Sequence, residues 1–382
     1  MEIRGLGQEH REAVRDLLDR AFGRRSDAYW ERAFERARST LGAGRQFGAF
    51  EGDRLVATAV IHDMAQWWHG RPVSMGGVSE VAVAPEMRGR GIGRALMTGV
   101  LESCAALGHA VSMLYPATTP LYRSFGWEHA GGLHGVRFAA EALRSVRAEP
   151  LEVRRATPDD AAEVARVIGQ VHRDARASGP VDWGEDRWRV LLADPEKYFY
   201  LAEDGFLEYR WSEGNECLEV GRLVAGSERT LRALWALVGS GSSTASSVTA
   251  YVAPQDPVFW LTRERSSEEV QRTRWMLRVV DAPAAIQARG YPAGVAAEVP
   301  LIIDDPWSPA NAGAWRLEVK DGSGRLERSA ETPGAVRVGA GGLAALYSGV
   351  PTATLRAAGL LEGDAPELDA VFAALPFSLD HF

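Results

Sequence analysis

Hydrophobic and polar positions follow the same order twice along the chain. At Ile3 and again at Val153, a short strand-like stretch leads through a polar turn into a helix whose apolar residues recur at helical spacing. Such self-similarity predicts two related domains in tandem. The apolar helix faces consist of Val14, Leu17, Leu18 and Phe22 in the first copy and of Ala161, Val164, Val167 and Ile168 in the second.

Both copies continue with strands and one amphipathic helix. In the first copy, strand-like stretches flank the Gly52–Asp53 turn, a nearly all-apolar strand covers residues 78–83, and a helix follows over residues 91–107. The second copy keeps this order, as a hairpin, a strand and a helix, over residues 197–239. After residue 280 the pattern changes to alternating strands followed by short helices, which predicts a third, α+β unit.

Length, charge and cysteine content narrow the class of protein. A chain of 382 residues fits two or three domains, and 46% hydrophobic residues let each of them build a core. The net charge of -8 argues against nucleic-acid binding and suits a positively charged small substrate. No apolar signal core or membrane-length apolar run occurs, and Cys104 and Cys217 alone make neither a disulfide framework nor a zinc site. We therefore expect a soluble cytoplasmic protein without metal and without a membrane partner.

A turn rich in glycine and arginine, residues 88–93, separates the apolar strand from its helix. Backbone N–H groups at a helix start are unpaired and attract phosphate, and Gly91 and Gly93 allow close approach. The turn is not a Walker A loop, since it lacks the Gly-Lys-Ser/Thr ending, nor a dinucleotide fingerprint, since the third glycine is missing. It predicts a phosphate site, and the alternative is a merely tight β–α turn.

The turn resembles the (Gln/Arg)-x-x-Gly-x-(Gly/Ala) pyrophosphate loop of the GCN5-related N-acetyltransferases, and "LYPATTPLYRSFGW" is similar to the segment after their fifth strand. The resemblance implies that acetyl-coenzyme A binds here as acetyl donor and that a backbone N–H of strand 81–83 polarises its thioester. It makes Tyr122 the general acid that protonates the departing thiolate, with Tyr115 as the rival and packing as the alternative. The cofactor-binding residues that it implies are Val81, Ala82, Val83, Arg88, Gly89, Arg90, Gly91, Ile92, Gly93, Arg94, Ala117 and Thr118.

The second copy keeps the strand and the helix but has "VGRLVAGSERTLRAL" where the first has "VAVAPEMRGRGIGRAL". The whole arrangement resembles the Eis (enhanced intracellular survival) family, including the "RWMLRVVD" junction and the aromatic last residue. The expected fold class is mixed α/β and α+β. A catalytic acetyltransferase domain covers residues 1–148, a degenerate copy without cofactor covers 149–280, and a sterol-carrier-like α+β domain covers 281–382. The resemblance implies N-acetylation of aminoglycosides or other polyamines by direct attack in a ternary complex, and a homohexamer.

The chain ends on an aromatic residue, Phe382, with no polar tail. The family pattern makes its terminal carboxylate the proton acceptor for the attacking amine, whereas Glu80 is a second candidate and a hydrophobic plug is the alternative. His381 stands where some members have an acidic residue, so amine recognition can differ there. Residues that could line the amine pocket, or else pack on a helix face, are Phe22, Asp27 and Trp30.

Two other functions compete with this reading. A non-catalytic acyl-coenzyme A or lipid-binding module would bind the cofactor tightly without turning over any amine. An enzyme that acetylates protein lysines or N-termini would need an open groove for a peptide.

Overall fold

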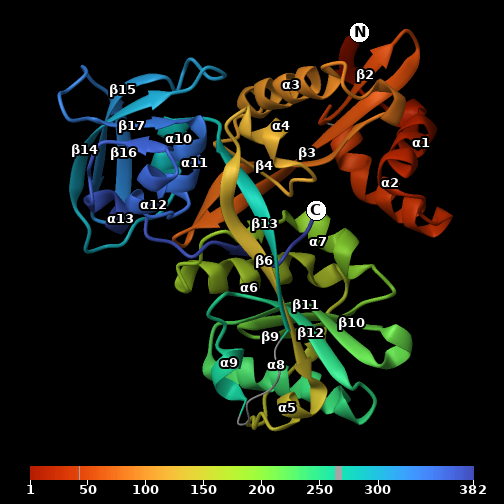
Figure 1. The fold of residues 1–382 in the computed structure, drawn as a ribbon. Helices are drawn as coiled ribbons and strands as arrows, with labels where there is room; N and C mark the ends of the chain where they lie inside the picture. The colour runs from red at the N-terminus through yellow and green to blue at the C-terminus, as the bar shows by residue number, and fades with distance from the viewer. Residues whose placement is uncertain (43, 263–268) are drawn as a thin grey trace.

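A computed structural model describes residues 1–42, 44–262 and 269–382. Most strands of these residues join one mixed 14-stranded sheet, and strands between residues 297 and 362 form a separate five-stranded sheet (Figure 1). The strands of the large sheet are β1 (Glu2–Gly5), β2 (Gln46–Glu51), β3 (Arg54–Trp68), β4 (Arg71–Val83), β5 (Val111–Leu114), β6 (Glu128–Ala139), β7 (Arg154–Arg155), β8 (Val181–Asp182), β9 (Tyr198–Ala202), β10 (Gly205–Ser212), β11 (Cys217–Ala225), β12 (Ser247–Val252), β13 (Glu269–Val279) and β19 (Phe377–Ser378).

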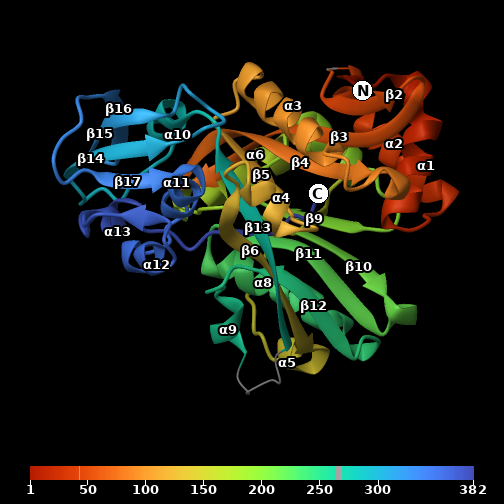
Figure 2. The same ribbon diagram turned by 45° about the horizontal axis from the view of Figure 1, so that its top comes forward.

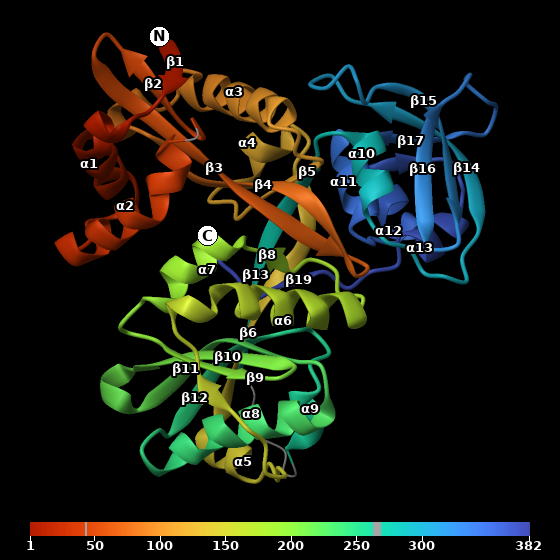
Figure 3. The same cartoon turned by 180° about the vertical axis from the view of Figure 1, so that it is seen from behind.

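Helices cover the large sheet where the apolar stripes predict them. In the first domain α1 and α2 lie on one side of the sheet and α3 on the other (Figures 1 and 3). The helix expected over 91–107 is α3, and the expected strand 78–83 is the last part of the longer β4. The helices packed on this sheet are α1 (Arg11–Phe22), α2 (Asp27–Gly42), α3 (Ile92–Ala106), α4 (Thr119–Arg123), α5 (Ala140–Arg144), α6 (Ala161–Asp174), α7 (Glu185–Leu192), α8 (Glu228–Ser240) and α9 (Val258–Leu261).

Two long strands, β6 and β13, interlock the first and second domains. β13 is the last strand in the sequence of the second domain, yet it lies between β5 and β6 and completes the sheet of the first. The far half of β6 in turn pairs with β12 of the second domain. Figure 1 shows both strands running from one domain into the other. The predicted limit between residues 148 and 149 therefore divides one continuous sheet, and the predicted domain limits stay predictions.

The third domain has the strand order β16-β15-β14-β17-β18. It is joined to the rest by a fully buried ion pair, in which Arg278 of β13 donates to both carboxylate oxygens of Asp305, at 2.7 and 2.6 Å. Its elements are α10 (Ala282–Ala288), β14 (Ala297–Asp304), β15 (Gly313–Lys320), β16 (Ser323–Arg328), β17 (Val336–Gly339), α11 (Ala340–Tyr347), α12 (Thr352–Ala357), β18 (Leu361–Glu362) and α13 (Glu367–Val371).

The C-terminal segment leaves the third domain and returns to the other two. After α13 the chain forms β19, which pairs in parallel with β6 at Gly132 and Leu133. It then ends between the first and second domains (Figures 1 and 2). Figure 3 shows α6 at the same boundary, where His172 of α6 lies 6.1 Å from the Trp67 ring of β3. No helix among the described residues is long and apolar enough to span a membrane.

Candidate active site

A cleft opens where β4 and β5 separate. The two strands pair in parallel only as far as Val78 and Leu114. Beyond this point β4 keeps β3 as its neighbour, with a register shift and a left-handed backbone at Glu80 (φ 53°). The backbone of residues 79–83 thus has one edge that no described strand covers. N–H groups on such an edge can stabilise negative charge on an acyl oxygen.

The glycine-rich turn lies at the start of α3. Gly89 and Gly91 have φ values of 78° and 79°, a conformation that favours glycine. A Cβ added at either residue would meet nothing within 4 Å, so the turn borders open space. Gly91 begins α3 without a side-chain cap, and the first N–H groups of a helix have no intrahelical partner. An uncapped helix start beside open space fits the diphosphate of acetyl-coenzyme A.

The arginines of this region differ in their surroundings. Arg88 donates to the carbonyl oxygen of Val83 at 3.3 Å, which ties the turn to the end of β4. Arg90 is exposed, lies 3.8 Å from Glu51, and contacts Met87. The Arg94 guanidinium stands 5.5 Å from the Phe125 ring. Unlike Arg88, the exposed Arg90 can move toward a bound anion without breaking a hydrogen bond to the backbone.

Two tyrosines border the cleft in different states. Tyr122 of α4 is buried, and burial raises its pKa to about 12, so its hydroxyl stays protonated at neutral pH. No partner within the described residues takes this hydroxyl. The Tyr115 hydroxyl donates to the carbonyl oxygen of Asp380 at 2.6 Å, and burial raises its pKa as well. The Tyr115 proton is thus engaged by the C-terminal segment, which favours Tyr122 as the proton donor.

Phe382 is inserted between the first two domains. Its ring centroid lies 6.0 Å from His62, 5.9 Å from Tyr115 and 6.0 Å from Trp183. A Cβ on Gly77 would stand 2.9 Å from the Phe382 ring, so the absence of a side chain there makes room for it. The last residue is therefore anchored by rings from both domains.

His62 and Ser79 extend the polar wall of the cleft. His62 Nε2 lies 2.8 Å from Ser79 Oγ, and Ser79 borders the cleft. Burial, followed by the positive charges of Arg187 and Arg45, lowers the pKa of His62 to about 3. A neutral imidazole can hold the Ser79 hydroxyl but is too weak a base to take a proton from an ammonium group.

The structure brings some of the expected residues together and leaves others apart. Glu80, Tyr122 and Phe382 line one cleft of about 280 Å³. Trp30 is instead buried in the core, where its indole N–H donates to Asp19, and Asp27 pairs with Arg15 on the exposed surface. The other lining residues are Phe22, Val78, Ser79, Val81, Tyr115, Pro116, Ala117, Thr273, Arg274 and His381.

Several of these residues carry no signal in the sequence. Thr273 and Arg274 reach the cleft only because β13 is inserted into the first domain's sheet. No sequence motif indicates Gly77, His62 or Trp183 either, since these residues matter only through their positions around Phe382. Thr118, one of the predicted cofactor-binding residues, lies directly before α4, and its side chain does not cap that helix.

The second domain retains the separation of strands but not the turn. β11 and β12 pair in parallel only as far as Val220 and Ala250. The helix that follows β11, α8, is capped by its own chain, because Ser227 Oγ accepts from the Thr230 N–H at 3.3 Å. Gly226 stands alone before the capped start of α8, and a Cβ on it would lie 3.2 Å from the Asp204 carboxylate, so the glycine-rich turn beside open space is not repeated here. The loss of cofactor binding in this domain stays a prediction.

Family models match three successive parts of the chain. A model described as an acetyltransferase (GNAT) domain matches residues 2–130, and a second model of the same description matches 179–279. A sterol carrier protein domain model matches residues 282–377.

Whole-length relatives agree with these matches. The crystal structure of a GCN5-related N-acetyltransferase from Kribbella flavida is 45% identical, with a TM-score of 0.95 over 100% of this chain and 98% of that one. Eis1 from Mycobacterium abscessus is 25% identical, with a TM-score of 0.77 over 100% of both chains. The N-acetyltransferase Eis of Mycobacterium tuberculosis is 28% identical over 355 residues, 86% of this chain and 85% of that protein.

Proposed function

The chain belongs to the Eis family of GCN5-related N-acetyltransferases, and we propose that it acetylates primary amines of a polycationic small molecule that is aminoglycoside-like or polyamine-like. As a member of this family it is an enzyme that transfers an acetyl group from acetyl-coenzyme A to an amine. The predicted family, fold class and acetyl donor are thereby confirmed. The observation that carries the proposal is the meeting of Tyr122, Glu80 and the chain end at one cleft.

The donor side of the cleft uses backbone groups and one tyrosine. Acetyl-coenzyme A supplies the acetyl group activated as a thioester. The N–H groups at the start of α3 and the turn 88–93 would hold its diphosphate, and the open edge of residues 79–83 would donate to the acyl oxygen. Tyr122 is then the proton donor to the departing sulfur, because it lines the cleft and, unlike Tyr115, its hydroxyl does not donate to the C-terminal segment.

The acceptor side needs a group that takes a proton from the amine. Free alkylamines are mostly protonated near pH 7, so an attacking nitrogen must be neutralised first. The terminal carboxylate of Phe382 is the proposed acceptor. Because a terminal carboxylate is intrinsically a weak base, it acts through a water or becomes a stronger base through desolvation when Phe382 is buried. Glu80 lies in the same cleft and stabilises the arriving cation. Both substrates bind together, and the amine attacks the thioester directly.

A panel of amines tests the proposal. Release of coenzyme A thiol is measured with aminoglycosides, spermidine and lysine-containing peptides, and the Tyr122→Phe protein serves as control. We expect the small polycations to show the highest kcat/KM. Turnover of peptides alone would overturn the proposed substrate class, and binding of acetyl-coenzyme A without turnover would favour a non-catalytic module.

We also propose a homohexamer in the cytoplasm. Trp260 and Leu375 are large apolar residues that are 72% and 62% exposed, which suits surfaces covered in an assembly. Cys104 and Cys217 are buried free thiols, which suits a reducing compartment. Light scattering at micromolar concentration tests the assembly, and a monomer would refute it.

A further inference from the structure

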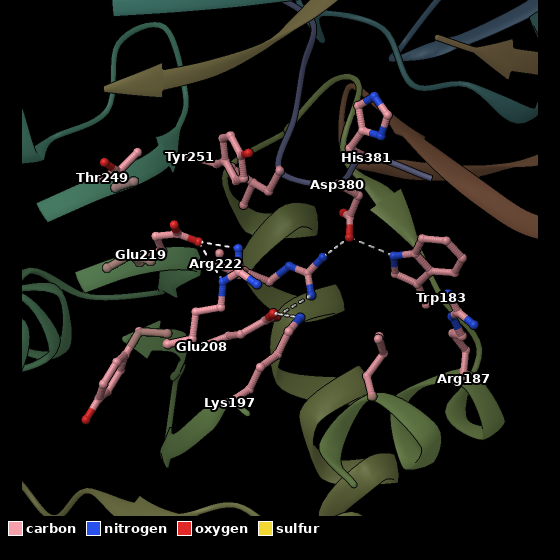
Figure 4. A pocket seen from close by; sticks show the side chains of 17 residues that line it. Trp183, Arg187, Lys197, Glu208, Glu219, Arg222, Thr249, Tyr251, Asp380 and His381 are labelled. Carbon is pink, nitrogen blue, oxygen red and sulfur yellow. Dashed lines mark hydrogen bonds and ion pairs between the residues drawn. The ribbon is translucent and has the colours of Figure 1, made fainter. Parts of the chain in front are cut away.

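Asp380 ties the end of the chain to the second domain. Its carboxylate oxygen Oδ1 accepts a hydrogen bond from the indole N–H of Trp183 at 2.8 Å and forms an ion pair with Arg222 (Figure 4). Its backbone carbonyl accepts from Tyr115 of the first domain at 2.6 Å. One residue of the C-terminal segment is thus held by both domains.

Arg222 of β11 is buried in the second domain. Its side chain is 5% exposed, and its guanidinium lies 4.7 Å from the Trp188 ring centroid. Glu208 lies 3.7 Å from its Nη1 and also accepts from Lys197 (Figure 4). A buried, stacked guanidinium presents its planar donors to Asp380 in a fixed direction.

The position of Arg222 corresponds to that of Glu80 in the first domain. In each domain the parallel pairing of the central strands ends at a valine, Val78 or Val220, and the charged residue follows two positions later. In the first domain this position borders the catalytic cleft. In the second domain the same position faces the C-terminal segment, next to a separate cleft of about 450 Å³. In the second domain, the position that corresponds to Glu80 thus binds the C-terminal segment of the chain.

We propose that the Arg222–Asp380 ion pair is a clamp that positions the terminal carboxylate of Phe382 in the catalytic cleft. This role rests on the proposed function of that carboxylate. Asp380 lies two residues from the end, and a residue spans at most about 3.6 Å, so a fixed Asp380 confines the carboxylate to roughly 7 Å around it. Arg222 and Asp380 are positioning residues, since they act through Phe382 and touch no reacting atom.

Digestion from the C-terminus measures the clamp without any assay of activity. Carboxypeptidase cleaves only a released chain end, so its rate follows the population of the opened segment. In the full-length protein, Arg222→Gln and Asp380→Asn should each release Phe382 roughly tenfold faster or more, because each removes the buried attraction between Arg222 and Asp380 that holds the segment. Asp380→Asn keeps an oxygen for Trp183 and removes only the charge, so it stays informative if Arg222→Gln fails to fold.

Kinetics then connect the clamp to catalysis. Both variants should lower kcat by about tenfold while the KM for acetyl-coenzyme A changes less than about twofold, and the double variant should lose no more than either single one. Arg222→Lys should restore part of kcat, because it keeps the charge. The matched control is Arg337→Gln, which breaks an exposed pair with Asp304 in the third domain and should change neither quantity.

The outcomes separate the two hypotheses. Unchanged release of Phe382 from Asp380→Asn would overturn the clamp. Faster release together with an unchanged kcat would keep the clamp and instead overturn the proposed role of the terminal carboxylate.

Discussion

Adding one glycine after Phe382 should abolish acetylation while leaving the fold intact. The extension keeps the aromatic ring, whose contacts with His62, Tyr115 and Trp183 anchor the segment. It turns the carboxylate of Phe382 into a peptide group and moves the negative charge by about 3.6 Å. General acid–base groups contribute about 10²–10⁴-fold to rate, so we expect a loss of about 3–5 kcal/mol of transition-state stabilisation.

The assay compares the extended protein with the complementary variant Phe382→Ala. Phe382→Ala keeps the carboxylate at the chain end and removes the ring with its packing in the space left by Gly77. Initial rates of coenzyme A release give kcat, isothermal titration gives the affinity for acetyl-coenzyme A, and thermal unfolding gives Tm. The extended protein should lose kcat with little change in affinity or Tm, whereas Phe382→Ala should lower Tm as well. A fully active extended protein would show that the terminal residue is a hydrophobic plug.

Three further predictions follow from the site and the core. Tyr122→Phe should lower kcat about 10²–10⁴-fold in steady-state kinetics with an unchanged KM for acetyl-coenzyme A, and Tyr115→Phe should lower it much less; the reverse order would mean that Tyr115 is the acid. Gly91→Val should raise that KM at least about tenfold, whereas Gly359→Val, at an equally left-handed glycine beside open space in the third domain, should leave it unchanged. Burial, with a smaller effect of the Arg222 charge, lowers the pKa of His172 from 6.5 to about 4, so the neutral form stabilises the fold fully above pH 6.5 and less as the pH falls toward 4. That shift corresponds to about 3 kcal/mol. Between pH 7 and pH 4 the free energy of unfolding of the parent protein, measured with denaturant, should therefore fall by that much more than that of His172→Gln. Equal losses in both proteins would contradict the prediction.

The local features of this protein could be predicted from its sequence. The helix α3 begins and ends within one residue of the range that its apolar spacing gives, because helix periodicity and the glycines before it are local signals. The difference between the two copies is also a local signal, because the second has no counterpart of the turn at residues 88–93.

The long-range features could not be predicted in this way. For Trp30 the sequence leaves open whether it lines the amine pocket or packs on a helix face, and in the structure it is buried in the core, because spacing alone does not tell which side of α2 meets the sheet. The insertion of β13 between β5 and β6 joins Leu114 to Met276, and no pattern in either strand indicates this pairing. The need for a glycine at position 77 likewise becomes clear only when the Phe382 ring, from the distant chain end, is seen to lie against it.

The interlocked strands β6 and β13 affect how the protein folds during its synthesis on the ribosome. Leu114 of β5 pairs with Met276 of β13, so roughly 160 further residues must be synthesised after β5 before the first domain's sheet is complete. At about 5–20 residues per second, the edge of β5 stays unpaired for roughly 10–30 s of translation. An open strand edge can pair wrongly with other chains, so the growing chain is prone to aggregate during this interval. A gene fragment that stops at residue 148 would fix the protein in this vulnerable state, and it should accumulate as aggregate.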